Sequence, residues 1–179
     1  MAYEAQEAHR RAALVFTLFD ANGNGVLDAG DFDLMTERVL AVAEDSSGAD
    51  RQALSDSLRR YWESLLAALD ANGDGVISSE EFSGFVLNTE LFGPTASAFA
   101  DALATLGDPD GDGLIERPRF VGLMSAIGFE KPNIEALFDA FGPDGRDRIP
   151  VSTWADGIRD YYCPDKAGIP GDHLVPATA

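Results

Sequence analysis

Two twelve-residue stretches, beginning at Asp20 and Asp70, repeat the same order of oxygen-bearing, glycine and apolar residues. They read Asp-Ala-Asn-Gly-Asn-Gly-Val-Leu-Asp-Ala-Gly-Asp over 20–31 and Asp-Ala-Asn-Gly-Asp-Gly-Val-Ile-Ser-Ser-Glu-Glu over 70–81. Each carries an oxygen side chain at positions 1, 3, 5, 9 and 12, and a glycine at position 6, where the chain must turn sharply. Because Ca²⁺ takes six to eight oxygen ligands at about 2.3–2.6 Å, this spacing predicts a loop that curls round a hard cation.

This order of residues is the EF-hand pattern, and two copies of it make the signal specific. Positions 1, 3 and 5 each supply one side-chain oxygen, position 7 supplies its main-chain carbonyl, and position 12 supplies the last carboxylate. The predicted ligands are Asp20, Asn22, Asn24, Val26 and Asp31 in the first loop, and Asp70, Asn72, Asp74, Val76 and Glu81 in the second. The sequence therefore predicts two Ca²⁺ sites.

The two loops differ at position 12, which is Asp31 in the first loop and Glu81 in the second. We expect Glu81 to grip Ca²⁺ with both oxygens while Ser78, at position 9, acts through water. Asp31 is one methylene shorter and favours a six-coordinate site, which is the octahedral arrangement that Mg²⁺ demands. Asp28 at position 9 adds a further carboxylate. We therefore expect Mg²⁺ to compete with Ca²⁺ in the loop over 20–31.

Two further copies of the loop are damaged. The third, over 108–119, keeps four carboxylates but ends on Arg119, and the fourth, over 142–153, keeps a carboxylate ligand only at Asp144. Two interpretations of the third loop stay open: Arg119 is a built-in counter-ion, or it swings outward and leaves a weak cation site. The carboxylates of that weak site would be Asp108, Asp110, Asp112 and Glu116. We expect the fourth loop to bind nothing.

Helical periodicity flanks all four loops, because apolar residues recur there at steps of three and four. The clearest run precedes the second loop, between Leu54 and Leu69. These patterns predict an all-α, compact EF-hand protein with eight helices in four helix-loop-helix units that form two packed lobes. We expect an N-terminal pair with both intact loops over 1–90, a C-terminal pair with both degenerate loops over 91–162, and an irregular tail over 163–179. The exiting helices should begin near Asp31, Glu81, Arg119 and Thr153.

Within each pair, the residues at position 8 should form a short antiparallel bridge, Leu27 with Ile77 and Ile115 with Ile149. Such bridges explain why damaged loops persist, because each one supports its partner. The segment over 88–95, which joins the halves, is short and contains a Gly-Pro pair that we expect to break any helix. The two lobes should therefore pack against each other.

The chain has 179 residues, a formal charge of −18 and a single cysteine, Cys163. The charge argues against nucleic acid and anionic membranes as partners, and one cysteine allows no internal disulfide. The N-terminus shows no basic and apolar leader, and no long apolar run occurs, so a soluble cytoplasmic protein is expected. We expect a monomer that is not an enzyme, because no Ser-His-Asp or Cys-His arrangement is evident.

The four-loop plan resembles the bacterial calerythrin-like proteins, which are close in architecture to the invertebrate sarcoplasmic calcium-binding proteins. The resemblance rests on a long first interval between loops, damaged loops beside sound ones, and a short joint between the halves. It spans about residues 4–162. It implies a compact eight-helix protein that buffers calcium inside the cell or carries its signal.

We predict an intracellular Ca²⁺ buffer or modulator. Sensor EF-hands tend to be rich in methionine, whereas Met35 and Met124 are the only internal ones here, beside eleven phenylalanines. This composition favours a molecule that stays closed. The alternative is a Ca²⁺-triggered regulator that exposes an apolar surface to one specific protein partner. A small-ligand carrier, like the photoproteins and luciferin-binding proteins of similar plan, is less favoured because His9 and His173 lie at the chain ends.

Overall fold

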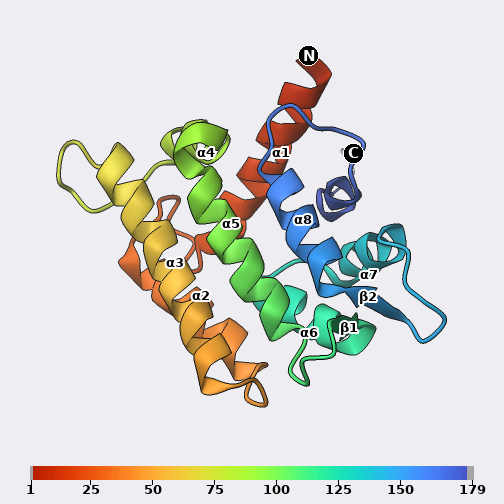
Figure 1. Ribbon diagram of the computed structural model, residues 1–179. Helices are drawn as coiled ribbons and strands as arrows, with labels where there is room; N and C mark the ends of the chain where they lie inside the picture. The colour runs from red at the N-terminus through yellow and green to blue at the C-terminus, as the bar shows by residue number, and fades with distance from the viewer. Residues whose placement is uncertain (1, 177–179) are drawn as a thin grey trace.

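The computed structural model describes residues 2–176, and its regular structure is almost wholly helical (Figure 1). Within these residues the eight α-helices are α1 (Ala2–Phe19), α2 (Ala29–Ala41), α3 (Gly48–Leu69), α4 (Ser79–Val86), α5 (Thr89–Leu106), α6 (Arg117–Ile127), α7 (Lys131–Ala140) and α8 (Val151–Tyr161). Two short strands, β1 (Leu114–Glu116) and β2 (Arg148–Pro150), and a 3₁₀-helix, η1 (Pro170–Leu174), complete the described chain. The predicted all-α class and the eight helices are confirmed.

Four helix-loop-helix units follow one another, and each loop lies between an odd-numbered helix and the even-numbered helix after it. Each exiting helix begins two residues before position 12 of its loop, at Ala29, Ser79, Arg117 and Val151. In the first two units, position 9 is the N-cap: the side chains of Asp28 and Ser78 accept the amides of Asp31 and Glu81. A cap that satisfies these otherwise free amides fixes where the helix starts.

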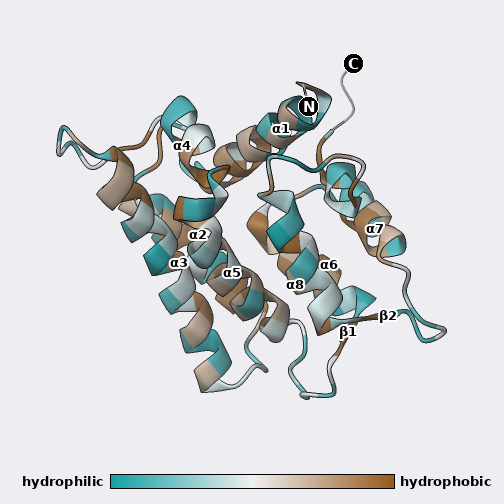
Figure 2. Cartoon of the chain, turned by 45° about the horizontal axis from the view of Figure 1, so that its top comes forward, coloured by the Kyte–Doolittle hydropathy of each residue, from teal (hydrophilic) through white to brown (hydrophobic). Residues whose placement is uncertain are grey.

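The core is continuous through both halves, and Tyr61 of α3 lies at its aromatic centre. Its ring lies 4.8–6.4 Å, between centroids, from rings on α1, α2, α4 and α5 and from Tyr162, which follows α8. The hydroxyls of Tyr61 and Tyr162 are 3.0 Å apart and both side chains are buried. Figure 2 shows polar and apolar residues alternating along the helices, as amphipathic helices require.

The two halves are packed through α5, which lies against α3 on one side and α8 on the other (Figure 1). The two packed lobes are therefore confirmed, but the helix break that we expected at Gly93-Pro94 is wrong. Helix α5 begins directly after its N-cap, Asn88, and continues through Pro94. Proline removes only the hydrogen bond to the carbonyl of Glu90, and both residues are exposed, so water can solvate that carbonyl.

The expected division at residue 90 falls within the first turn of α5 and stays a prediction. The tail that we expected to be irregular contains η1, which packs mainly on α7 and also touches α8 and α1. The last part of the predicted tail, 177–179, lies outside the described residues.

Candidate metal centre

The loops that begin at Asp20, Asp70 and Asp108 follow the same backbone course. In each, the carboxylate at position 1 accepts the amides of positions 5 and 6, with nitrogen–oxygen distances of 2.8–3.1 Å. The glycines at positions 4 and 6 have φ between 69° and 86°, which costs glycine little and other residues more. The sequence thus curls the chain around the first carboxylate in all three loops.

In the first loop, the predicted ligands on the loop and the carboxylate at its end lie together. The side-chain oxygen of Asn22 accepts the backbone amide of Asn24 at 3.1 Å, and the side-chain oxygen of Asn24 accepts that of Val26 at 3.1 Å. Asp31 is fully buried, and its two oxygens accept the amides of Asn22 at 3.3 Å and Asp28 at 2.9 Å. The shorter residue at position 12 therefore reaches the opposite side of its loop.

In the second loop, the predicted ligands on the loop contact one another, whereas the residue at position 12 lies at the loop edge. The side-chain amide of Asn72 donates to Asp74 at 3.0 Å, and Asp74 accepts the amide of Val76 at 3.1 Å. Glu81 is exposed, and its carboxylate accepts the amide of Ser78 at 2.9 Å. This capping contact holds Glu81 beside the loop that it would close.

The third loop holds the tightest acidic cluster. Among residues 2–176, it is the only group of three carboxylates whose ligand atoms lie within 4.8 Å of one another: Asp108, Asp110 and Asp112. The expected fourth carboxylate, Glu116, lies in β1 and precedes α6 as its N-cap without a capping hydrogen bond from its side chain. The second loop, where the sequence predicts that Glu81 grips Ca²⁺ with both oxygens, does not gather three carboxylates in this way.

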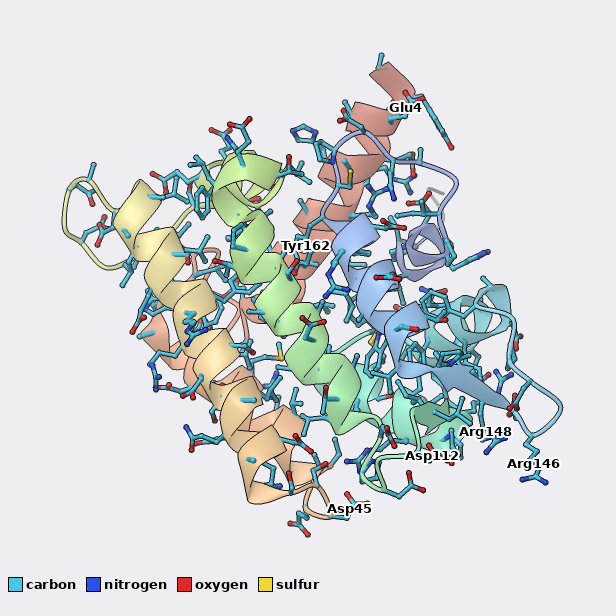
Figure 3. All side chains as sticks on the ribbon, viewed as in Figure 1. Glu4, Asp45, Asp112, Arg146, Arg148 and Tyr162 are labelled. Carbon is cyan, nitrogen blue, oxygen red and sulfur yellow. The ribbon has the colours of Figure 1, made fainter. Side chains whose placement is uncertain are left out.

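The counter-ion interpretation of Arg119 is wrong: its side chain points outward, as the alternative required, while the weak cation site of that alternative stays a prediction. The guanidinium donates to the carbonyls of Leu106 and Val42, both at 2.9 Å, and to the carboxylate of Asp45 at 2.7 Å. It turns away because the carbonyl ends of two helices, α5 and α2, offer free acceptors there. The cation that does approach the cluster is Arg148, 3.9 Å from the Asp112 carboxylate (Figure 3).

In the fourth loop, a guanidinium contacts the one carboxylate that stands at a ligand position. Asp144 accepts the amides of Arg146 and Arg148 at 2.9 and 3.0 Å, and also the guanidinium of Arg148 at 3.0 Å. Desolvation opposes the effect, but these hydrogen bonds lower the pKa of Asp144. Asp147 keeps φ at 62°, the left-handed conformation that glycine provides at position 6 elsewhere. A hydrogen bond from Arg117 lowers the pKa of Asp147.

Both predicted bridges between loops are confirmed. Leu27 and Ile77 exchange two backbone hydrogen bonds of 2.9 and 3.0 Å. Ile115 pairs with Ile149 at the centre of the antiparallel β1–β2 ribbon. All four side chains are fully buried, so the two loops of each pair are joined by backbone hydrogen bonds and by packing.

Arg11 was missed by sequence reasoning although a signal was present. It lies three residues after Ala8 and four before Val15, on the stripe that α1 buries, and it is 0% exposed. A charged residue on an apolar helical face needs hydrogen-bonding partners, and distant residues supply them. Arg148, whose guanidinium approaches Asp112 and contacts Asp144, was also missed. Its place within a loop that carries a carboxylate ligand is the signal that could have indicated such a contact.

An apolar cavity of about 60 Å³ lies between α1 and the C-terminal half. Its lining includes Val15, Phe99, Met124, Trp154 and Tyr161. A cavity that holds benzene measures about 150 Å³, so this space is too small for a larger organic ligand. It gives the small-ligand carrier no support.

The EF-hand family profile matches residues 63–86, which include the second loop. Calexcitin-1 of Caenorhabditis elegans is 27% identical over 168 residues, covering 89% of this chain and 81% of that protein. Calerythrin of Saccharopolyspora erythraea is 23% identical over 155 residues, covering 82% of this chain and 87% of calerythrin.

Solved structures share the fold. A calcium-binding protein of Streptomyces coelicolor superposes with a TM-score of 0.70 at 26% identity, covering 88% of this chain and 98% of that one. The amphioxus sarcoplasmic calcium-binding protein gives 0.68 at 20% identity, covering 97% and 98%. The chain is a calerythrin-like EF-hand protein that shares the fold of the sarcoplasmic calcium-binding proteins. The resemblance stated from the sequence is thereby confirmed. Between residues 2 and 176, no helix of this calerythrin-like protein has the length and apolar character that crossing a membrane requires.

Proposed function

We propose that this calerythrin-like protein binds Ca²⁺ at its two N-terminal loops and acts as a cytoplasmic buffer or modulator. The observation that carries the proposal is the bridge between Leu27 and Ile77, which joins two loops that both end in a carboxylate. The ligands are Asp20, Asn22, Asn24, Val26 and Asp31 in one loop, and Asp70, Asn72, Asp74, Val76 and Glu81 in the other. No enzymatic activity is proposed.

Position 12 favours the N-terminal pair over the acidic cluster of the third loop. Asp31 and Glu81 can close their loops over a cation, whereas position 12 of the third loop is Arg119, whose guanidinium is engaged elsewhere. The guanidinium of Arg148 also lies near the cluster, and a cation there would meet its repulsion. Three carboxylates without a closing ligand leave a large part of a six- to eight-oxygen shell to water. The third loop is therefore the weaker candidate.

The first loop is the one where we propose that Mg²⁺ competes. Asp31 is short, fully buried and held by the amides of Asn22 and Asp28, so its carboxylate has little freedom to grip with both oxygens. Mg²⁺ accepts a six-coordinate octahedral shell, while Ca²⁺ gains from a larger and more flexible one. Mixed occupancy of this loop follows.

Calorimetric titration with Ca²⁺ tests the proposal. We expect two sites in the unaltered protein and one in Glu81→Gln, which keeps the length and the capping oxygen but loses the charge. The remaining site should weaken about fivefold or more, because the bridge couples the two loops. Glu80→Gln, which changes the exposed neighbour, is the matched control and should keep both sites. Two undiminished sites in Glu81→Gln, or none in the unaltered protein, would contradict the proposal.

The second candidate is a Ca²⁺-triggered regulator that exposes an apolar surface to one protein partner. The observation that favours it is the likeness to the Streptomyces coelicolor protein, which is described in terms of prokaryotic calcium-mediated regulation. An apolar dye separates the two roles, because its fluorescence should rise with Ca²⁺ only for the regulator. In either role we propose a monomer, and with a charge of −18 neither nucleic acid nor a membrane surface is proposed as a partner.

A further inference from the structure

Both helices of the first EF-hand, α1 and α2, are tied to the C-terminal half by one arginine each. Arg11 of α1 reaches the segment over 161–172, and Arg119 at the start of α6 reaches the end of α2. We call these two sets of contacts the α1 clamp and the α2 clamp. Neither belongs to a metal loop of the N-terminal pair.

The α1 clamp encloses a guanidinium completely. Arg11 is 0% exposed and donates to the carbonyls of Tyr161, Cys163 and Lys166 at 2.8, 2.9 and 3.0 Å. It also donates to the Asp172 carboxylate at 2.7 Å, whose other oxygen accepts two amides of the tail. The Tyr161 hydroxyl donates back to the carbonyl of Arg11 at 3.1 Å. The tail is thus folded around a residue of α1.

The α2 clamp is made by Arg119, which occupies position 12 of the third loop in place of a carboxylate ligand. Arg119 joins the carbonyl of Leu106, at the end of α5, to the carbonyl of Val42, which is the C-cap of α2. It also donates to Asp45 and to the buried hydroxyl of Ser46, both at 2.7 Å. Figure 3 shows Asp45 at the end of the molecule beyond α2 and α3. Three hydrogen bonds of Arg119 therefore reach the end of α2 and the residues after it, and the fourth anchors the guanidinium to α5 in the C-terminal half.

The clamps hold the ends of α1 and α2 that are remote from the first loop. A change in the angle between the two helices moves these remote ends the most. Arg11 precedes Asp20 by nine residues and Val42 follows Asp31 by eleven. At 1.5 Å per residue the lever arms are about 13 and 16 Å. Sensor EF-hands open by about 40°, which displaces a point on a 13 Å arm by about 9 Å. A hydrogen bond tolerates only a few tenths of an ångström, so one clamp must break before the angle between α1 and α2 can change by this amount.

We propose that the two clamps fix α1 and α2 relative to the C-terminal half, so that Ca²⁺ fills the loop of the first EF-hand without a change of helix angle that exposes the core. This inference rests on the proposed function, since it concerns the response of the same site. It assigns the roles of positioning residues to Arg11 and Arg119, and it implies that Ca²⁺ binds without a change in the arrangement of α1 and α2 described here. A variant without the clamps becomes a protein that exposes apolar surface when Ca²⁺ binds.

The test compares the unaltered protein with Arg119→Met, Asp172→Asn and their combination. Asp172→Asn preserves the size of the side chain and spares the buried Arg11, and Arg119→Met keeps an unbranched apolar chain while it removes the guanidinium. Arg146→Met is the matched control, because Arg146 is exposed at the tip of the fourth loop (Figure 3). Amide hydrogen exchange is followed in the metal-free protein, and apolar-dye fluorescence is followed with and without Ca²⁺. Circular dichroism checks the fold, and the single variants carry the test if the combination does not fold.

Without metal, we expect amides in the first half of α1 and the second half of α2 to exchange severalfold faster in the clamp variants than in the control. With Ca²⁺, dye fluorescence should rise severalfold in the combination and stay flat in the unaltered protein and the control. Unchanged exchange rates, or an equal dye response in the unaltered protein, would overturn the proposal. Absence of Ca²⁺ binding in calorimetry would refute the proposed function instead. The amide exchange rates of the metal-free protein would then still test whether the clamps hold α1 and α2.

Discussion

The hydroxyl pair of Tyr61 and Tyr162 gives a sharp test of how the two halves are joined. Tyr61 belongs to α3 and Tyr162 follows α8, yet their oxygens lie 3.0 Å apart in an otherwise apolar core. Tyr61 is 0% and Tyr162 6% exposed, so water cannot replace either partner. Substituting one tyrosine by phenylalanine removes one hydroxyl and leaves the other buried without its partner.

The free-energy cost follows from that imbalance. A buried polar group left unpaired costs about 1–3 kcal/mol, whereas removing both partners together is nearly neutral. We therefore expect Tyr61→Phe and Tyr162→Phe each to lower the free energy of unfolding by about 1–3 kcal/mol. The double variant should lose no more than either single variant. The aromatic rings stay in place in all three variants, so packing changes little.

Urea unfolding followed by circular dichroism measures the three free energies. The expected coupling between the two sites is at least about 1 kcal/mol, which is within the range seen for residues in contact. Losses that simply add in the double variant would refute the reasoning, because they would mean that the two hydroxyls do not depend on each other. Equal m-values across the set would show that the unfolded state is unaffected.

Three further predictions test other parts of the structure. Gly157→Ala should destabilise the protein by about 1–3 kcal/mol in urea unfolding, because the added carbon would lie 2.7 Å from the Phe141 ring. Gly122→Ala, with open space around it, should stabilise α6 by up to about 1 kcal/mol. Equal effects of the two substitutions would contradict this packing. Burial raises the pKa of three tyrosines above the unfolded value near 10. Their neutral forms therefore stabilise the fold fully below about pH 10, and this stability is lost as the pH rises from there toward the raised folded-state pKa values. In a Tyr3→Phe variant, which lacks the exposed fourth tyrosine, phenolate absorbance of Tyr61, Tyr161 and Tyr162 should appear together with unfolding. Phenolate absorbance of this variant while it is still folded would refute the prediction. Excess Mg²⁺ should weaken Ca²⁺ binding at the first loop in calorimetry and leave the second unchanged; an equal loss at both would contradict the distinction drawn at Asp31.

Local spacing was enough to predict the loops, their bridges and the helices. Positions 1 to 12 lie within a few residues of one another, so the course of the chain around Asp20 or Asp70 follows from neighbouring side chains and glycines. Pro94 was misjudged for a local reason as well. A proline in the second turn of an exposed helix costs one hydrogen bond, and α5 gains more from its packing against α3 and α8.

The direction of the arginine side chains could not be predicted in the same way. Arg119 has the charge expected of a counter-ion, but its acceptors lie 13 to 77 residues away in the sequence. Arg11 meets partners 150 or more residues further on, although its place on the buried stripe of α1 was visible. Sequence periodicity indicates which face a residue occupies, whereas its partners depend on how the whole chain packs.

The central claim is that Ca²⁺ occupies the N-terminal pair although the tightest carboxylate cluster lies in the third loop. Equilibrium dialysis with metal analysis can count the bound Ca²⁺ in a variant with three substitutions in that cluster, Asp108→Asn, Asp110→Asn and Asp112→Asn. The account predicts two bound ions in this variant, the same number as in the unaltered protein. A count that falls by one when the cluster is neutralised would contradict it.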